Sequence, residues 1–72
     1  MLTNELINRL SNKEVVYFKN SFDEVVFKAN PLEGYLAKRK NGKVYQIEIG
    51  AKLLTEAFLE GCIITKEEFE NY

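Results

Sequence analysis

The sequence contains no histidine and no tryptophan, and it has one cysteine and one proline in 72 residues. Without histidine, the chain lacks the base that most often activates a serine or cysteine nucleophile, and it lacks a common zinc ligand. A single cysteine, Cys62, forms no internal disulfide, so the fold does not depend on an oxidising compartment. These absences favour a cytoplasmic protein that is not an enzyme and holds no metal or cofactor.

Two further absences exclude a membrane segment and one class of nucleotide-binding site. No apolar run approaches the ~20 residues that span a bilayer, so we expect no membrane segment. The four glycines are isolated from one another, which excludes a glycine-rich phosphate-binding loop. Cys62 lies in an apolar stretch without a flanking cation, so we expect a buried, structural cysteine. The length predicts one domain, residues 1–72.

Charge is spread unevenly along the chain, although the net charge is only −1. Residues 1–54 carry nine basic and six acidic side chains, whereas residues 55–72 carry one basic and five acidic side chains. The chain is therefore dipolar in sequence. This pattern argues against a general nucleic-acid coat protein, which needs an overall positive field.

Three segments have helical signals. Leucines and an isoleucine at positions 2, 6, 7 and 10 make one face of an N-terminal helix, with Thr3 as its cap and a Leu2–Ile7 contact. The apolar residues of segment 51–60 recur at helical spacing, and Gly61 ends that helix. A last short helix follows Thr65, which forms a capping box with Glu68.

Four segments have strand signals: 14–19, 23–29, 35–40 and 43–49 are rich in β-branched and aromatic residues. Asn41-Gly42 favours a two-residue type I′ turn between the last two. That turn predicts a register in which Lys38 opposes Tyr45, Leu36 opposes Ile47 and Lys40 opposes Lys43. The same register directs Leu36, Tyr45, Ile47 and Ile49 toward the core.

These elements predict an α+β fold in the order α-β-β-β-β-α-α. We expect a four-stranded antiparallel meander packed on one face by the N-terminal helix and the C-terminal helices. Residues 15–19 and 43–49 would be its edges, where a second copy would pair to form a homodimer. The opposite sheet face would be solvated or would bind a ligand.

The predicted hairpin carries the densest basic patch in the chain. A basic β-ribbon with aromatic residues can grip a nucleic acid or a nucleotide phosphate. The alternative is that lysines at a hairpin tip keep a sheet edge soluble. The candidate residues are Lys38, Arg39, Lys40, Lys43 and Tyr45.

The C-terminal segment carries the second candidate surface, which is acidic. Such a surface can meet a basic protein partner and speed its association. The alternative is an ordinary solvated helix face. The candidate residues are Glu60, Glu67, Glu68, Glu70 and Tyr72.

The C-terminal stretch Ala57-Phe58-Leu59-Glu60-Gly61, followed by Ile64-Thr65-Lys66-Glu67-Glu68-Phe69, resembles the ends of many small phage and prophage proteins. The abundance of Lys, Asn, Glu and Ile resembles proteins of low-GC Gram-positive bacteria and their phages. The resemblance implies a small non-enzymatic protein that binds and inhibits or modulates a host or phage protein, such as a component of a defence system. Nucleic-acid or nucleotide binding through the basic hairpin is the second hypothesis.

Overall fold

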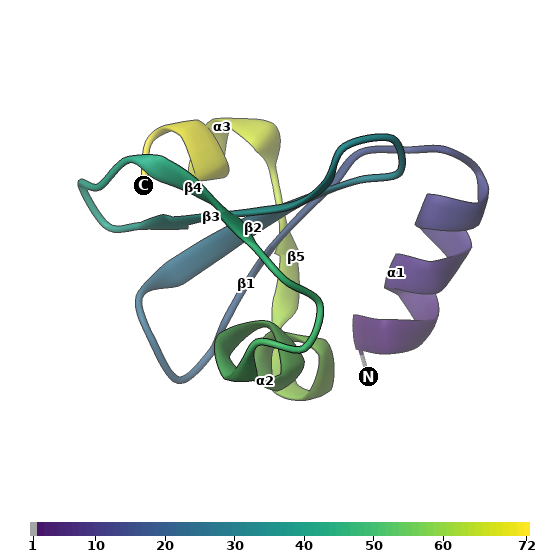
Figure 1. The fold of residues 1–72 in the computed structure, drawn as a ribbon, viewed down its shortest axis with the longest axis horizontal. Coiled ribbons are helices and arrows are strands. Elements are labelled where there is room, and N and C mark those ends of the chain that lie inside the picture. The colour runs from purple at the N-terminus through teal and green to yellow at the C-terminus, as the bar shows by residue number, and fades with distance from the viewer. Residues whose placement is uncertain (1) are drawn as a thin grey trace.

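The computed structural model describes the backbone of residues 2–72 and the side chains from Asn4 onward (Figure 1). The predicted α+β fold class is confirmed. The predicted cap at Thr3 and the Leu2–Ile7 contact lie outside the described side chains. The elements in chain order are α1 (Leu2–Ser11), β1 (Val16–Lys19), β2 (Val25–Asn30), β3 (Gly34–Arg39), β4 (Val44–Ile47), α2 (Lys52–Glu60), β5 (Cys62–Ile64) and α3 (Lys66–Glu70).

The described sheet has five antiparallel strands in the order β4-β3-β2-β1-β5, one more than predicted. The extra strand is β5, which joins α2 to α3 and pairs with β1 from Lys19↔Cys62 to Tyr17↔Ile64. Three residues are too few for strand alternation to be visible in sequence. The prediction that residues 15–19 form an edge is therefore wrong, because β4 and β5 are the edge strands. Cys62 is exposed on β5 rather than buried.

The β3–β4 hairpin is offset by one residue from the predicted register: Lys38 opposes Val44, Ala37 opposes Tyr45 and Tyr35 opposes Ile47. A type I′ turn needs two residues with positive φ. Asn41 adopts φ 57°, but Gly42 does not have a positive φ, and its N–H donates to Arg39 O at 2.8 Å. A one-residue shift moves the side chains of one strand to the other face.

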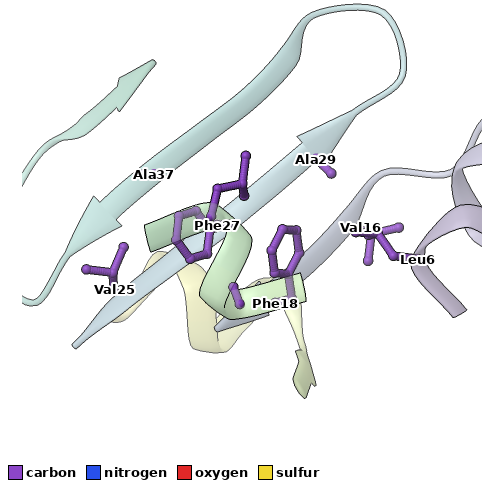
Figure 2. Close-up of a cluster of buried hydrophobic side chains, with 9 residues drawn as sticks. Leu6, Val16, Phe18, Val25, Phe27, Ala29 and Ala37 are labelled. Carbon is purple, nitrogen blue, oxygen red and sulfur yellow. The ribbon is translucent and has the colours of Figure 1, made fainter. Parts of the chain in front are cut away.

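The main core lies between the sheet and the helices α1 and α2, which cover one sheet face as predicted (Figures 1 and 2). Phe18 and Phe27 are fully buried, and their rings stack with centroids 5.2 Å apart. Ala37 opposes Phe27 across β2 and β3 and is also fully buried. A small residue at this position leaves room for the phenyl ring, so Ala37 and not Leu36 faces the main core.

The third helix corrects the prediction that all helices pack on one face. Phe69 of α3 packs with Val26 and Ile64 in a second buried cluster, and Tyr17 and Tyr72 flank it. Val26 and Phe27 are consecutive residues of β2, so their side chains point to opposite faces. In Figure 1, α2 and α3 lie at opposite ends of β5, which joins them. The rings of Tyr17 in β1 and Phe69 in α3 are in contact, with their centroids 5.2 Å apart.

Candidate functional site

The basic hairpin and the C-terminal helix, which the sequence presents as two separate surfaces, meet in the structure. Lys38 Nζ donates to the carbonyl oxygens of Glu70 at 2.8 Å and Phe69 at 3.3 Å. Asn41 N–H donates to Tyr72 O at 3.0 Å. A cation at the C-terminal end of a helix is favourable because unpaired carbonyls and the negative end of the helix dipole lie there. Lys38 therefore fastens α3 to the hairpin.

The five candidate residues of the basic hairpin do not share one face. Lys38 opposes Val44 and lies on the α3 face, whereas Arg39 and Tyr45 lie on the face of the main core. Lys40 and Lys43 are exposed in the loop between the strands. The predicted pairing of Lys38 with Tyr45 is wrong, since the register is offset by one residue. Arg39, Lys40 and Lys43 remain as an exposed basic tip.

The five candidate residues of the acidic surface are also divided. Glu67, Glu68 and Glu70 are exposed on α3, whereas Glu60 ends α2, which packs on the other sheet face. The capping box is confirmed: Glu68 N–H donates to Thr65 Oγ1 at 3.1 Å, and Thr65 N–H donates to Glu68 Oε1 at 3.4 Å.

Tyr72, the fifth residue of the predicted acidic surface, is partly buried against the second cluster that contains Phe69. Burial raises the pKa of the Tyr72 phenol above its ordinary value of 10.0, and the carboxylate of Glu24 adds to the rise. Its role in the structure is therefore to cover the second cluster and, through its carbonyl, to hold the hairpin loop.

An apolar hollow of about 190 Å³ opens beside the main core and was not predicted from the sequence. Its lining residues come from four parts of the chain. Two of these residues, Ile7 at 57% and Ile49 at 65%, are largely exposed. The rings of Phe58 and Tyr35, which both line the hollow, are edge-on to each other with centroids 6.0 Å apart. The lining residues are Leu6, Ile7, Leu10, Tyr35, Ile49 and Phe58.

A second hollow has a volume of about 360 Å³, and Tyr35 is the residue that its lining shares with the apolar hollow. It is formed where β3 begins and β4 ends, and Glu33 and Glu48 stand exposed at its rim. Glu48 lines this acidic hollow, while the next residue, Ile49, lines the apolar hollow.

The sequence contains two signals for the apolar hollow. Ile7 lies beside the Leu6–Leu10 stripe of the first helix, one position too far round to be buried with it. Ile49 extends the alternation of the last predicted strand beyond β4, which ends at Ile47. Neither signal shows that the two residues line one hollow, because this depends on how α1 docks.

The described residues contain no group of three His, Cys, Asp or Glu side chains placed to hold a metal ion. From residue 2 onward, no helix has the length and apolar character needed to cross a membrane. No protein-family model matches the sequence, and no curated protein or solved structure matches it significantly. The functional argument is therefore carried by the apolar hollow.

Proposed function

We propose that this chain is a small non-enzymatic interaction protein that binds another protein and inhibits or modulates it. The apolar hollow carries the proposal. Its volume of about 190 Å³ is below the 300–1,000 Å³ typical of small-molecule pockets, so it suits an anchoring side chain of a protein partner. Ile7 and Ile49 expose apolar surface beside the hollow. Burying this surface against a partner is favourable because it removes apolar groups from water.

The biological setting in the proposal comes from the C-terminal resemblance to small phage and prophage proteins. We accordingly propose a host or phage protein in the cytoplasm as the partner, with a component of a defence system as one such target. A fold that needs no disulfide is compatible with that compartment.

The test is affinity capture from a host lysate with matched variants. Ile49→Ser removes an apolar side chain from the hollow, and Leu32→Ser removes one from the β2–β3 turn, where Leu32 is 94% exposed. We expect the wild type and Leu32→Ser to retain a stoichiometric protein partner and Ile49→Ser to lose it. The partner's activity, measured with and without the wild-type protein, then tests inhibition. Recovery of no partner under several conditions, or equal recovery by Ile49→Ser, contradicts the proposal.

Nucleic-acid or nucleotide binding is the second candidate function, supported by the exposure of Arg39, Lys40 and Lys43 at the hairpin tip. Lys38 is excluded from the tested set because its ammonium is engaged with α3. If three phosphates are neutralised, the affinity for a single-stranded oligonucleotide should fall with salt at a log–log slope of about −2. Unchanged binding after all three residues are replaced by serine would exclude this function.

A homodimer remains a prediction, now restricted to the edge strands β4 and β5. The predicted pairing along residues 15–19 is excluded because β2 and β5 flank β1 on both sides. Analytical ultracentrifugation over a range of protein concentrations measures the oligomeric state directly.

A further inference from the structure

We infer that two copies of this chain associate through the edge strand β5, which pairs with itself in antiparallel orientation with Ile63 of both copies at the two-fold axis. In this register, Glu60 of each copy lies opposite Lys66 of the other copy. The inference is independent of the proposed function, because no residue of β5 lines the apolar hollow.

The outer side of β5 is open to a further strand. Within the described sheet, β5 has β1 as a neighbour on one side and no strand on the other. An edge strand presents unpaired N–H and C=O groups that another chain can bind. The three residues of β5, Cys62, Ile63 and Ile64, include no proline and no charged side chain, which are common means of blocking an edge. A ladder of three residues is short, so neighbouring side chains have to hold the register.

Apolar side chains are exposed near the Gly61 end of β5. The hydroxyl of Ser21 donates to the carbonyl oxygen of Glu60, which places the β1–β2 loop beside the end of α2. Phe22 in this loop is 65% exposed, and Leu59 of α2 is 52% exposed. A second copy that pairs along β5 comes next to this end of the strand, and it would remove part of this apolar surface from water.

The charges that flank β5 determine the register. The two-fold axis between antiparallel copies of one strand passes between two copies of the same residue, because opposed side chains share a face. Glu60 ends α2 and Lys66 begins α3, and each lies three residues from Ile63. Both side chains are exposed, and the single ion pair among the described residues joins Arg9 to Glu5 instead. An axis at Ile63 therefore sets two pairs of opposite charges against each other.

The other edge strand, β4, lacks this symmetry. Lys43 precedes β4 and Glu48 follows it, but these residues are five positions apart, so no residue lies midway between them. A register that set them opposite each other would pair side chains from different faces of the sheet. Of the two edges, β5 is therefore the one whose flanking charges complement a second copy.

Charge reversal in the full chain tests the register. E60K leaves two basic side chains in each copy and K66E leaves two acidic ones, so each variant repels its own copy. Analytical ultracentrifugation should show a dissociation constant about 2- to 30-fold higher, as expected for the loss of two exposed ion pairs. Mixing the two variants, or combining both substitutions in one chain, should restore the association of the wild type.

The single variants are expected to fold, because lysine at the end of α2 and glutamate at the start of α3 both suit the helix dipole. Circular dichroism verifies this for every variant. The matched controls E33K and K40E make the same changes of charge at exposed positions in the β2–β3 turn and the hairpin tip. They should leave the dissociation constant at the value of the wild type.

Cysteine crosslinking locates the axis. With Cys62 replaced by serine, I63C should form a covalent dimer on oxidation, because opposed Cα atoms are about 4.5–5.5 Å apart and a disulfide spans that distance. In the wild type, Cys62 lies opposite Ile64 and about 7–8 Å from the second Cys62, so the unaltered chain should not crosslink. V44C on β4, in the same serine background, should also stay uncrosslinked.

A monomer over the whole concentration range would overturn the inference. So would single reversals that weaken association no more than E33K and K40E, or a mixture of E60K and K66E that fails to associate. Crosslinking through V44C but not through I63C would assign the dimer to β4 and would also overturn it. None of these results affects the capture of a protein partner that depends on Ile49, so the proposed function is tested separately.

Discussion

Replacing Gly61 with alanine tests the part of the fold that the sequence did not predict, the passage from α2 into β5. Gly61 adopts an extended conformation with φ −80°, so any residue could take its backbone angles. The constraint is space, because a Cβ there would collide with the backbone oxygens of Lys19 and Ala57. Backbone atoms cannot rotate away as a side chain does, so β5 has to move from β1 or the end of α2 has to shift.

The expected cost is that of overpacking, about 1–3 kcal/mol. A 72-residue domain has a free energy of unfolding of roughly 4–11 kcal/mol, so the loss is a substantial fraction of the total. It should lower the melting temperature by about 4–24 °C. Urea and thermal unfolding followed by far-UV circular dichroism measure both quantities.

Gly50→Ala is the matched control, since a Cβ at Gly50 meets nothing within 4 Å and its φ is not positive. Alanine there restricts the unfolded chain and should stabilise the protein by about 0.4–1 kcal/mol. The two substitutions are chemically identical, so their difference isolates the collision. Equal stability of the two variants would show that Gly61 does not approach the β1 backbone, and the placement of β5 would be refuted.

Three other substitutions test the packing of α3, the main core and the C-terminal tyrosine. Lys38→Met keeps the aliphatic stem but removes the bonds to the α3 carbonyls. It should cost about 0.5–1.5 kcal/mol and speed hydrogen exchange in α3, whereas the exposed Lys40→Met should change stability by less than about 0.5 kcal/mol. Phe27→Ala deletes a fully buried ring and should cost about 3–5 kcal/mol in urea unfolding, with a smaller loss contradicting its burial. The pKa of the Tyr72 phenol is raised in the folded state, so its contribution to the free energy of unfolding is complete below pH 10 and declines as the pH rises past that value. Tyr72→Phe should remove this decline. Unfolding free energies of the wild type and the variant, measured from pH 8 to 11, test this.

Local sequence signals predicted those features that depend only on residues within about ten positions of one another. The capping box of Thr65 and Glu68 and the strand character of β1 to β4 are of this kind. The register of the β3–β4 hairpin was not predictable from Asn41-Gly42, because Asn41 N–H is bound by Tyr72, more than 30 residues away. A hydrogen-bond partner that is so distant in the chain cannot be predicted from the sequence of the turn.

The candidate sites were less predictable than the fold, because charge runs in a sequence do not determine which face each side chain occupies. Lys38 and Arg39 are neighbours in sequence and lie on opposite faces of the sheet. Ile7 and Ile49 are distant in sequence and line one hollow. The apolar hollow is a consequence of how α1 docks on the sheet, and no local pattern encodes that docking.

The β3–β4 hairpin has a basic tip with Arg39, Lys40 and Lys43, and an acidic base with Glu33 and Glu48. The ends are five or six residues apart, roughly 17–20 Å along the strands. This separation exceeds the Debye length of about 8 Å at physiological salt, so an oligonucleotide bound at the basic tip should respond to Arg39, Lys40 and Lys43 alone. Replacing Glu33 and Glu48 with glutamine should therefore leave the oligonucleotide affinity unchanged at about 0.15 M salt and raise it at about 0.01 M, where the Debye length is about 30 Å. A change of equal size at both salt concentrations would mean that the glutamates contact the oligonucleotide directly, and the two ends of the hairpin would then act as one site.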